Sequence, residues 1–164
     1  MIAGPRELIG LDSNVVLRYL LHDDDEQYLA SKRLLESLTA ESPGFLTQVA
    51  LAEIHWVLSR GARLDRRTCL TVMRSLLERE ALEFDDPEGA VQALELAEEG
   101  ADFADALIET TMQQFGATRT VTFDRQAADR LGWERLGEQT RTGPVVDRTR
   151  SPYTPRDSNP EPTD

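Results

Sequence analysis

The sequence predicts an α/β fold in which a short parallel sheet is flanked by helices on both faces. Short apolar or β-branched runs, which are typical of strands, alternate with longer segments that repeat apolar residues at helical spacing. Strands that alternate with helices pair in parallel, because a crossover must return the chain to the same end of the sheet. The chain has 164 residues, which is enough for one domain with a sizeable core.

The expected elements follow one another along residues 8–136. The run Leu8-Ile-Gly-Leu11 is short and apolar, which indicates a buried strand. Gly100 and Gly116 follow two helical patterns and are expected to end them. The predicted strands are 8–11, 44–46, 81–84, 118–123 and 133–136, and the predicted helices are 14–21, 24–38, 48–59, 65–78, 87–98, 103–115 and 125–131.

The composition changes near residue 138. The last 27 residues hold five of the eight prolines and few side chains that a core would bury. Burial therefore cannot offset the conformational entropy that such a segment loses on ordering. We expect residues 1–137 to form one folded domain and residues 138–164 to be a proline-rich, disordered C-terminal tail. The four arginines and five acids of the tail leave −11 of the total charge of −12 on residues 1–137.

Composition excludes several classes of function. Cys69 is the only cysteine, so neither an intrachain disulfide nor a cysteine-based zinc site can form. No apolar run reaches the ~18 residues of a membrane span, and the N-terminus does not have the pattern of a signal peptide, so we expect a cytoplasmic protein without membrane contact. The acidity argues against a cationic DNA-binding module, although carboxylates that hold metal ions still permit contact with phosphates.

Four acids occupy positions where a solvated carboxylate is not expected. Asp12 and Asp124 each directly follow a predicted strand, where ligands of open parallel sheets bind. Glu53 has apolar neighbours at helical spacing, and Asp105 lies one turn into an apolar helix; an unpaired carboxylate on such a stripe is costly. Because the carboxyl ends of parallel strands meet at one edge, we expect the four acids to converge.

A cluster of carboxylate oxygens has the chemistry that Mg²⁺ or Mn²⁺ prefers. Each acid also has a simpler interpretation. Asp12, Asp102 and Asp124 can cap the helices that follow them. Glu53 can form an ion pair with an arginine, and Glu109 can face water. His55 is expected to be packed or to lie at an interface, and not to act as a base.

The segments around these acids resemble those of the PIN-domain ribonucleases, in particular the VapC-type toxins of prokaryotic toxin–antitoxin pairs. Residues 9–20 look like the opening strand and first helix of that family, with Ser13 in place of the threonine of its usual Asp-Thr-Asn. Residues 51–58, 101–108 and 122–125 look like the segments that carry the other acids. The likeness covers residues 8–136, and the tail has no counterpart.

The resemblance implies a PIN-like three-layer fold and a Mg²⁺- or Mn²⁺-dependent endoribonuclease that hydrolyses RNA. It also implies a homodimer that a cognate antitoxin protein holds inactive. The catalytic and metal-binding residues would be Asp12, Glu53, Asp105 and Asp124, with secondary roles for Ser13, Asn14 and Asp102. Arg119 and Arg125 flank the end of a late strand and either contact the RNA backbone or are ordinary surface charges.

Two other functions fit the sequence poorly. A phosphatase with an aspartyl nucleophile of the haloacid-dehalogenase type would have an acid two residues after Asp12, where this chain has Asn14. A phosphotransfer receiver domain would have a lysine at a late strand end, and the only lysine, Lys32, falls in an early helix. The remaining alternative is a catalytically inactive PIN-fold binding module that acts through a protein partner.

Overall fold

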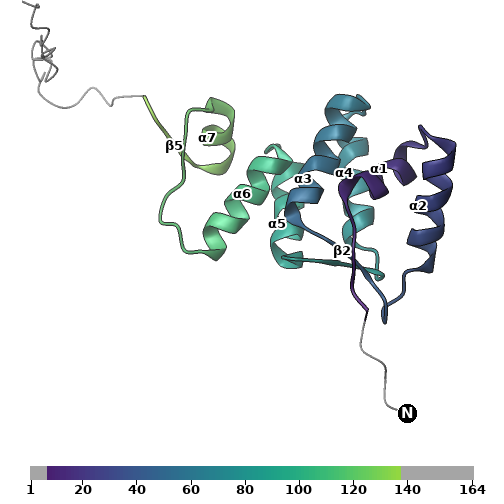
Figure 1. Cartoon of the computed structure of the whole chain (residues 1–164). Helices are drawn as coiled ribbons and strands as arrows, with labels where there is room; N and C mark the ends of the chain where they lie inside the picture. The colour runs from purple at the N-terminus through teal and green to yellow at the C-terminus, as the bar shows by residue number, and fades with distance from the viewer. Residues whose placement is uncertain (1–6, 138–164) are drawn as a thin grey trace, which may run out of the picture.

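The computed structural model describes residues 7–137, and the predicted tail at residues 138–164 lies outside the described residues. Helices and strands alternate as expected (Figure 1). The elements are β1 (Ile9–Gly10), α1 (Ser13–Leu21), α2 (Asp25–Ser37), β2 (Gly44–Leu46), α3 (Gln48–Trp56), the π-helical turn η1 (Val57–Gly61), α4 (Arg66–Leu77), β3 (Leu82–Phe84), α5 (Pro87–Glu98), α6 (Phe103–Gln114), β4 (Val121–Thr122), α7 (Arg125–Leu131) and β5 (Glu134–Arg135).

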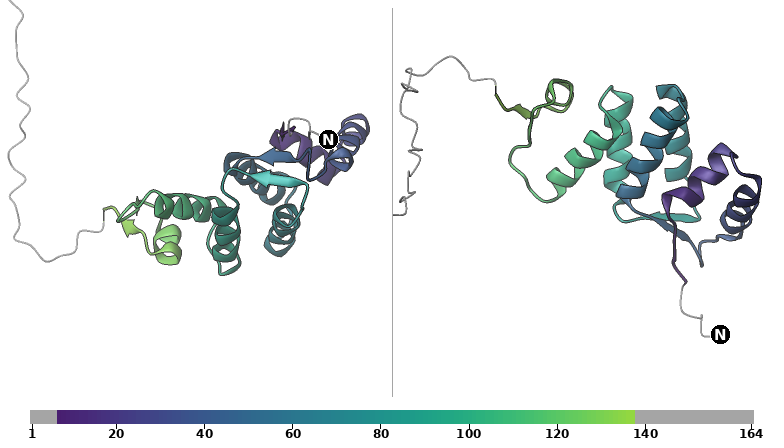
Figure 2. Two further views of the ribbon diagram at one scale, coloured as in Figure 1. Left: turned by 90° about the horizontal axis from the view of Figure 1, so that it is seen from below. Right: turned by 45° about the horizontal axis from the view of Figure 1, so that its top comes forward.

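The predicted α/β class is confirmed, and every strand pairing among the described residues is parallel. These strands form two sheets, however. One sheet has the order β1-β2-β3, and the other contains β4 and β5 alone. In Figure 2 (left), α1 and α2 lie to one side of β2 and β3, and α4 lies to the other. The pair of β4 and β5 lies at the far end of α6, away from the larger sheet (Figures 1 and 2).

The core lies between the larger sheet and helices α1 to α6. α5 presents small residues to this core, and a stripe of fully buried alanines allows the backbone of α6 to approach closely. Phe103, at the start of α6, is 0% exposed and is among the largest fully buried side chains. The buried alanines of α5 are Ala90, Ala93 and Ala97.

Helix α3 differs from the prediction of a buried helix over 48–59. It ends at Trp56, and η1 continues the chain with a wider turn. Leu51 and Ile54 are buried, but Val49 is 78% exposed and Trp56 is 63% exposed. Only one side of α3 therefore faces the core, and its apolar outer side is left in contact with solvent.

The first residue of β2, Gly44, has no room for a side chain. A Cβ atom built there would lie 2.6 Å from the Leu11 Cδ1 atom and 2.8 Å from the Leu38 Cδ1 atom. Because those leucines are buried, the Gly44→Ala variant must displace core atoms, and we expect it to lower the free energy of unfolding by about 1–3 kcal/mol.

Urea denaturation measures this loss, and Gly10→Ala is the matched control. A Cβ atom at Gly10 in β1 meets nothing within 4 Å. The free energy of unfolding of the Gly10→Ala variant is therefore expected to change by less than about 0.5 kcal/mol. Equal losses in the two variants would contradict the packing argument.

Candidate metal centre

The carboxylate of Asp12 is exposed and does not cap a helix. It directly follows β1 and occupies the N-cap position of α1, but its side chain makes no capping hydrogen bond. The side chain is exposed, and its Oδ2 atom accepts a hydrogen bond of 3.2 Å from Asn14 Nδ2. The capping interpretation of Asp12 is therefore wrong for its side chain, and the carboxylate is accessible to a ligand.

Ser13 connects the end of β1 to α3. Its Oγ atom donates a hydrogen bond of 2.7 Å to the Oε2 atom of Glu53, and Ser13 is only 1% exposed. Glu53 itself is exposed, so its carboxylate is held by Ser13 and open to solvent. Among the described residues no arginine pairs with Glu53, in contrast to the simpler interpretation of this acid. Asp12 and Glu53 thus come from neighbouring elements that Ser13 joins.

Asp102 and Asp124 both cap helices, as their simpler interpretation expected. The Asp102 carboxylate accepts hydrogen bonds from the backbone N–H groups of Ala104 and Asp105 at 2.9 and 3.3 Å. Asp124 accepts them from Gln126 and from the residue after it, at 2.7 and 3.1 Å. Such bonds satisfy the free N–H groups of a helix start. Each carboxylate still has acceptor capacity for a ligand.

Asp105 lies in the field of both capping acids. Burial raises the pKa of its carboxyl above the ordinary value, and the negative charges of Asp102 and Asp124 raise that pKa further. These three acids are therefore close enough to repel one another. A cation at this place would relieve the repulsion and favour the ionised form of Asp105.

The acids do not form one cluster within residues 7–137. No group of three or more histidine, cysteine or acidic residues in this range is placed to hold a metal ion. Glu53 joins the Asp12 side through Ser13, whereas Asp102, Asp105 and Asp124 interact at the start of α6. We expected Asp12 and Asp124 to follow strands of the same sheet. This expectation is wrong, because the strand before Asp124, β4, pairs with β5 in a sheet of its own. The donor set, all carboxylate oxygens, nevertheless has the chemistry that a hard divalent cation requires.

His55 is a packed residue, as predicted. It is 7% exposed, and its ring centroid lies 5.1 Å from that of Phe103. Burial lowers the pKa of His55, and the negative charge of Asp102 opposes this shift. The imidazole therefore supports the start of α6, on which the acids are placed.

A cavity of about 270 Å³ adjoins Asp102 and was not predicted from the sequence. His55 and Asp102 form part of its wall, and Trp56, Ser59 and Arg60 on α3 and η1 form another part. π-Helical turns such as η1 occur frequently at functional sites. The one signal for this cavity in the sequence was the tryptophan within an apolar helix. Because the whole helix was predicted to be buried, the tryptophan was expected to lie in the core.

The remaining polar candidates have defined partners. Glu109 accepts hydrogen bonds from Gln113 Nε2, at 2.6 Å, and from Trp133 Nε1, so it does not simply face water. Arg119 forms an ion pair of 3.1 Å with Glu134, and Arg125 forms one of 3.8 Å with Asp129. Exposed pairs of this kind contribute little to stability, and both arginines stay available for contact with RNA.

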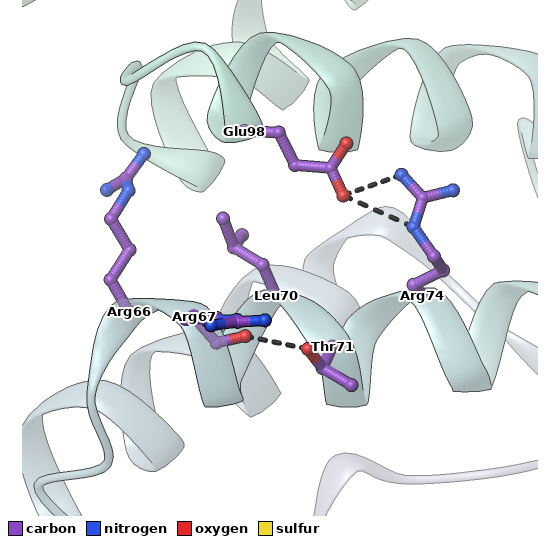
Figure 3. Close-up of a pocket in the computed structure, with 6 residues that line it drawn as sticks. All are labelled: Arg66, Arg67, Leu70, Thr71, Arg74 and Glu98. Carbon is purple, nitrogen blue, oxygen red and sulfur yellow. Dashed lines mark hydrogen bonds and ion pairs between the residues drawn. The ribbon is translucent and has the colours of Figure 1, made fainter.

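A second, basic pocket of about 470 Å³ lies between α4 and α5, and three arginines line it (Figure 3). Arg74 in its wall forms an ion pair of 2.6 Å with Glu98. The Arg66 guanidinium donates to the backbone carbonyls of Ala97 and Ala101, at the turn that precedes Asp102. Arg66 thereby attaches α4 to the turn that positions the start of α6.

The fold and the exposed carboxylates define an α/β domain with acids after its parallel strands. The family model of the PIN domain matches residues 9–133, and the chain belongs to the PIN domain family. This confirms the PIN-domain part of the resemblance. PIN domains are generally nucleases that bind RNA and typically use divalent metals. Neither the curated proteins nor the solved structures gave a match. No helix in the described part is long and apolar enough to cross a membrane.

Proposed function

We propose that this protein is a Mg²⁺- or Mn²⁺-dependent endoribonuclease that hydrolyses RNA phosphodiester bonds, and that it is the toxin of a toxin–antitoxin pair. The observation that supports the nuclease most directly is the exposed Asp12 carboxylate at the end of β1, next to the Ser13–Glu53 hydrogen bond. In a PIN domain these acids serve metal-dependent hydrolysis, which requires accessible carboxylates.

In this proposal Asp12, Glu53, Asp105 and Asp124 hold the metal. When bound, a divalent ion lowers the pKa of a water molecule and neutralises charge on the phosphodiester. Ser13 orients Glu53 through its hydrogen bond of 2.7 Å, and Asn14 orients Asp12. The remaining roles go to Asp102, which adds negative charge beside Asp105, and to Arg119 and Arg125, which contact the RNA backbone.

We also propose a protein partner, an oligomeric state and a cellular location. A cognate antitoxin would cover these acids, and the enzyme would act as a homodimer in the cytoplasm. Residues 1–137 would be the nuclease domain. An inactive PIN-fold binding module is less well supported, because Asp12 and Glu53 remain exposed rather than buried in structural contacts.

Incubation of the purified protein with RNA tests the proposal. Cleavage is expected in Mg²⁺ or Mn²⁺ and not in excess EDTA, and restoring the metal is expected to restore cleavage. Cleavage that persists in EDTA would contradict metal dependence. Absence of cleavage with every metal and RNA tested, by protein that is folded, would favour the binding module.

Metal binding is expected to raise the melting temperature. Carboxylates that repel one another in the folded protein gain a counter-charge, and a ligand that binds only the folded state stabilises it by about 2.7 kcal/mol at 100 times its dissociation constant. Differential scanning fluorimetry with MnCl₂ measures the shift, with KCl at matched ionic strength as the control. An unchanged melting temperature at millimolar Mn²⁺ would argue against a metal site.

A further inference from the structure

The side chain of Trp56 is exposed, although large aromatic rings are usually buried in cores or interfaces. Trp56 ends α3 and is 63% exposed. The other tryptophan, Trp133, donates a hydrogen bond from Nε1 to Glu109, whereas the ring of Trp56 has no stacking or hydrogen-bond partner within residues 7–137. Within the described part of the chain, this ring is therefore available to a ligand.

Trp56 also lines the cavity of about 270 Å³ that adjoins Asp102. Ser59 and Arg60 of η1 and Ala104 of α6 form other parts of its wall. The volume lies just below the ~300–1,000 Å³ that is usual for sites of drug-sized ligands. The cavity therefore suits a ligand group of one ring system, with an aromatic side chain on one side and polar groups around it.

The cavity lies beside acids of the proposed metal centre. Trp56 follows Glu53 by three residues in α3, and both are exposed, so the two side chains are neighbours on the outer side of the helix. Asp102 belongs to the wall of the cavity, and its charge acts on Asp105. A nucleotide that adjoins a phosphodiester at these acids is therefore within reach of the cavity.

Arg60 supplies a positive charge at this cavity. It is exposed, and no ion pair joins its guanidinium to a carboxylate within residues 7–137, whereas Arg119 and Arg125 are both paired. A guanidinium carries only hydrogen-bond donors and binds two phosphate oxygens at once in a planar geometry. Trp56 and Arg60 thus place an aromatic ring and a phosphate-binding group around one cavity.

The net charge of the domain makes an aromatic contact with RNA valuable. Binding to nucleic acids usually draws its affinity from cations that neutralise phosphates, but residues 1–137 carry a charge of −11. Stacking of a base on an aromatic ring does not depend on net charge, and every base offers a face for it. Bases of single-stranded RNA can stack on such a ring, whereas those of a duplex already stack on one another.

We propose that Trp56 stacks on an unpaired nucleobase next to the scissile phosphodiester, and that Arg60 binds the phosphate of the same nucleotide. This inference rests on the proposed nuclease function and adds the form of its substrate, which is single-stranded RNA. Both residues bind the substrate and take no part in the hydrolysis itself. Selection of unpaired segments follows, because a base within a duplex is not free to enter the cavity.

Tryptophan fluorescence detects a stacked base directly. The chain has two tryptophans, so Trp133→Phe leaves Trp56 as the only emitter, and Trp56→Phe leaves Trp133. Each change is combined with Asp12→Asn, so that RNA stays intact in Mg²⁺. An octaribonucleotide that cannot pair with itself is expected to quench the emission of Trp56 and to change that of Trp133 far less. Bound RNA that leaves the emission of Trp56 unchanged would overturn the proposal.

The affinity for the same labelled RNA, measured by fluorescence anisotropy, separates stacking from simple apolar contact. Trp56→Ala is expected to weaken binding by about 5–150-fold, the range for one base on an aromatic ring. Trp56→Phe keeps an aromatic face and should lose less, whereas Trp56→Leu should lose as much as Trp56→Ala. Phe115→Ala is the matched control, because Phe115 after α6 is 82% exposed. A Trp56→Leu variant that binds like the wild type, or an equal loss in Phe115→Ala, would contradict stacking at Trp56.

The dependence of this affinity on KCl tests the role of Arg60. Arg60→Gln is expected to make the plot of log K against log [KCl] shallower, by up to about 0.7, the value for one phosphate of a single strand. Trp56→Ala should leave this slope unchanged, because stacking releases no counterions. Arg63→Gln, at an exposed arginine that does not line the cavity, is the matched control. An unchanged slope in Arg60→Gln would remove Arg60 from the phosphate.

Cleavage by the otherwise unchanged protein separates this inference from the nuclease function on which it rests. Single-stranded RNA is expected to be cleaved faster than the same strand annealed to its complement. Equal cleavage of both forms would overturn the proposed base contact and leave the nuclease proposal standing. Quenching of Trp56 by RNA in a protein that cleaves none would instead refute the nuclease function and support the binding site.

Discussion

The Asp12→Asn variant is expected to lose RNA cleavage by about 10²–10⁴-fold, because a metal ligand contributes several kcal/mol of charge stabilisation and each 1.36 kcal/mol is a factor of ten in rate. Asparagine has nearly the same shape as aspartate but no negative charge. The Asp12 carboxylate accepts a hydrogen bond of 3.2 Å from Asn14 and caps no backbone N–H group of α1. The loss should therefore appear in catalysis rather than in folding.

Cleavage rates in saturating Mn²⁺, compared with the urea midpoint of each protein, test this expectation. The free energy of unfolding of Asp12→Asn is expected to stay within about 0.5 kcal/mol of that of the wild type. Glu41→Gln, at an exposed acid in the loop before β2, is the matched control for loss of one negative charge and should keep full activity. A fully active Asp12→Asn variant would remove Asp12 from the proposed metal centre.

The Phe103→Ala variant is expected to lower the free energy of unfolding by about 3–5 kcal/mol, the largest stability effect that we predict. Phe103 is 0% exposed in a core of closely packed alanines and leucines, and its ring lies against the buried His55 ring. Removing the ring loses its transfer free energy and leaves a cavity that rigid helices cannot fill.

Guanidinium denaturation measures this loss. Leu29→Ala is the comparison, because Leu29 on α2 is 50% exposed. This substitution is expected to lower the free energy of unfolding by no more than about 0.5 kcal/mol. Phe103→Leu should recover part of the stability, since it restores apolar volume. A Phe103→Ala variant as stable as Leu29→Ala would show that the start of α6 does not depend on this ring.

The position of Phe103 links stability to the site. It stands between Asp102 and Asp105 in the sequence, and both acids depend on the first turn of α6 for their placement. A destabilised start of α6 would weaken both the burial and the neighbouring negative charges that raise the pKa of Asp105. We therefore expect Phe103→Ala to weaken metal binding as well as folding.

Most helix positions could be predicted because their signals are local. The predicted helix over 103–115 corresponds to α6 at Phe103–Gln114, where Asp102 caps the start and Gly116 follows the end with a φ of +72°. The helix over 65–78 corresponds to α4, with Asp65 as its cap. Helix starts of this kind are decided by hydrogen bonds between residues two or three positions apart.

The environment of α3 could not be predicted in the same way. Apart from Gln48, Glu53 and His55 its residues are apolar, and a helix without a clear polar face is expected to be buried. In the structure Val49 and Trp56 remain exposed, because the neighbouring elements cover only one side of the helix. The cavity beside Asp102 follows from this exposure, so its lining residues were recognised only in three dimensions.

By itself, the sequence determined the α/β class, the order of the elements, the PIN family and the acids that follow β1 and β4. Each depends on spacing within short segments. Only the tertiary structure decided that β4 pairs with β5, that β1 and β4 belong to separate sheets, and that Ser13 holds Glu53. Strand pairing joins residues far apart in the sequence, and its outcome depends on which long loops close and which surfaces become buried.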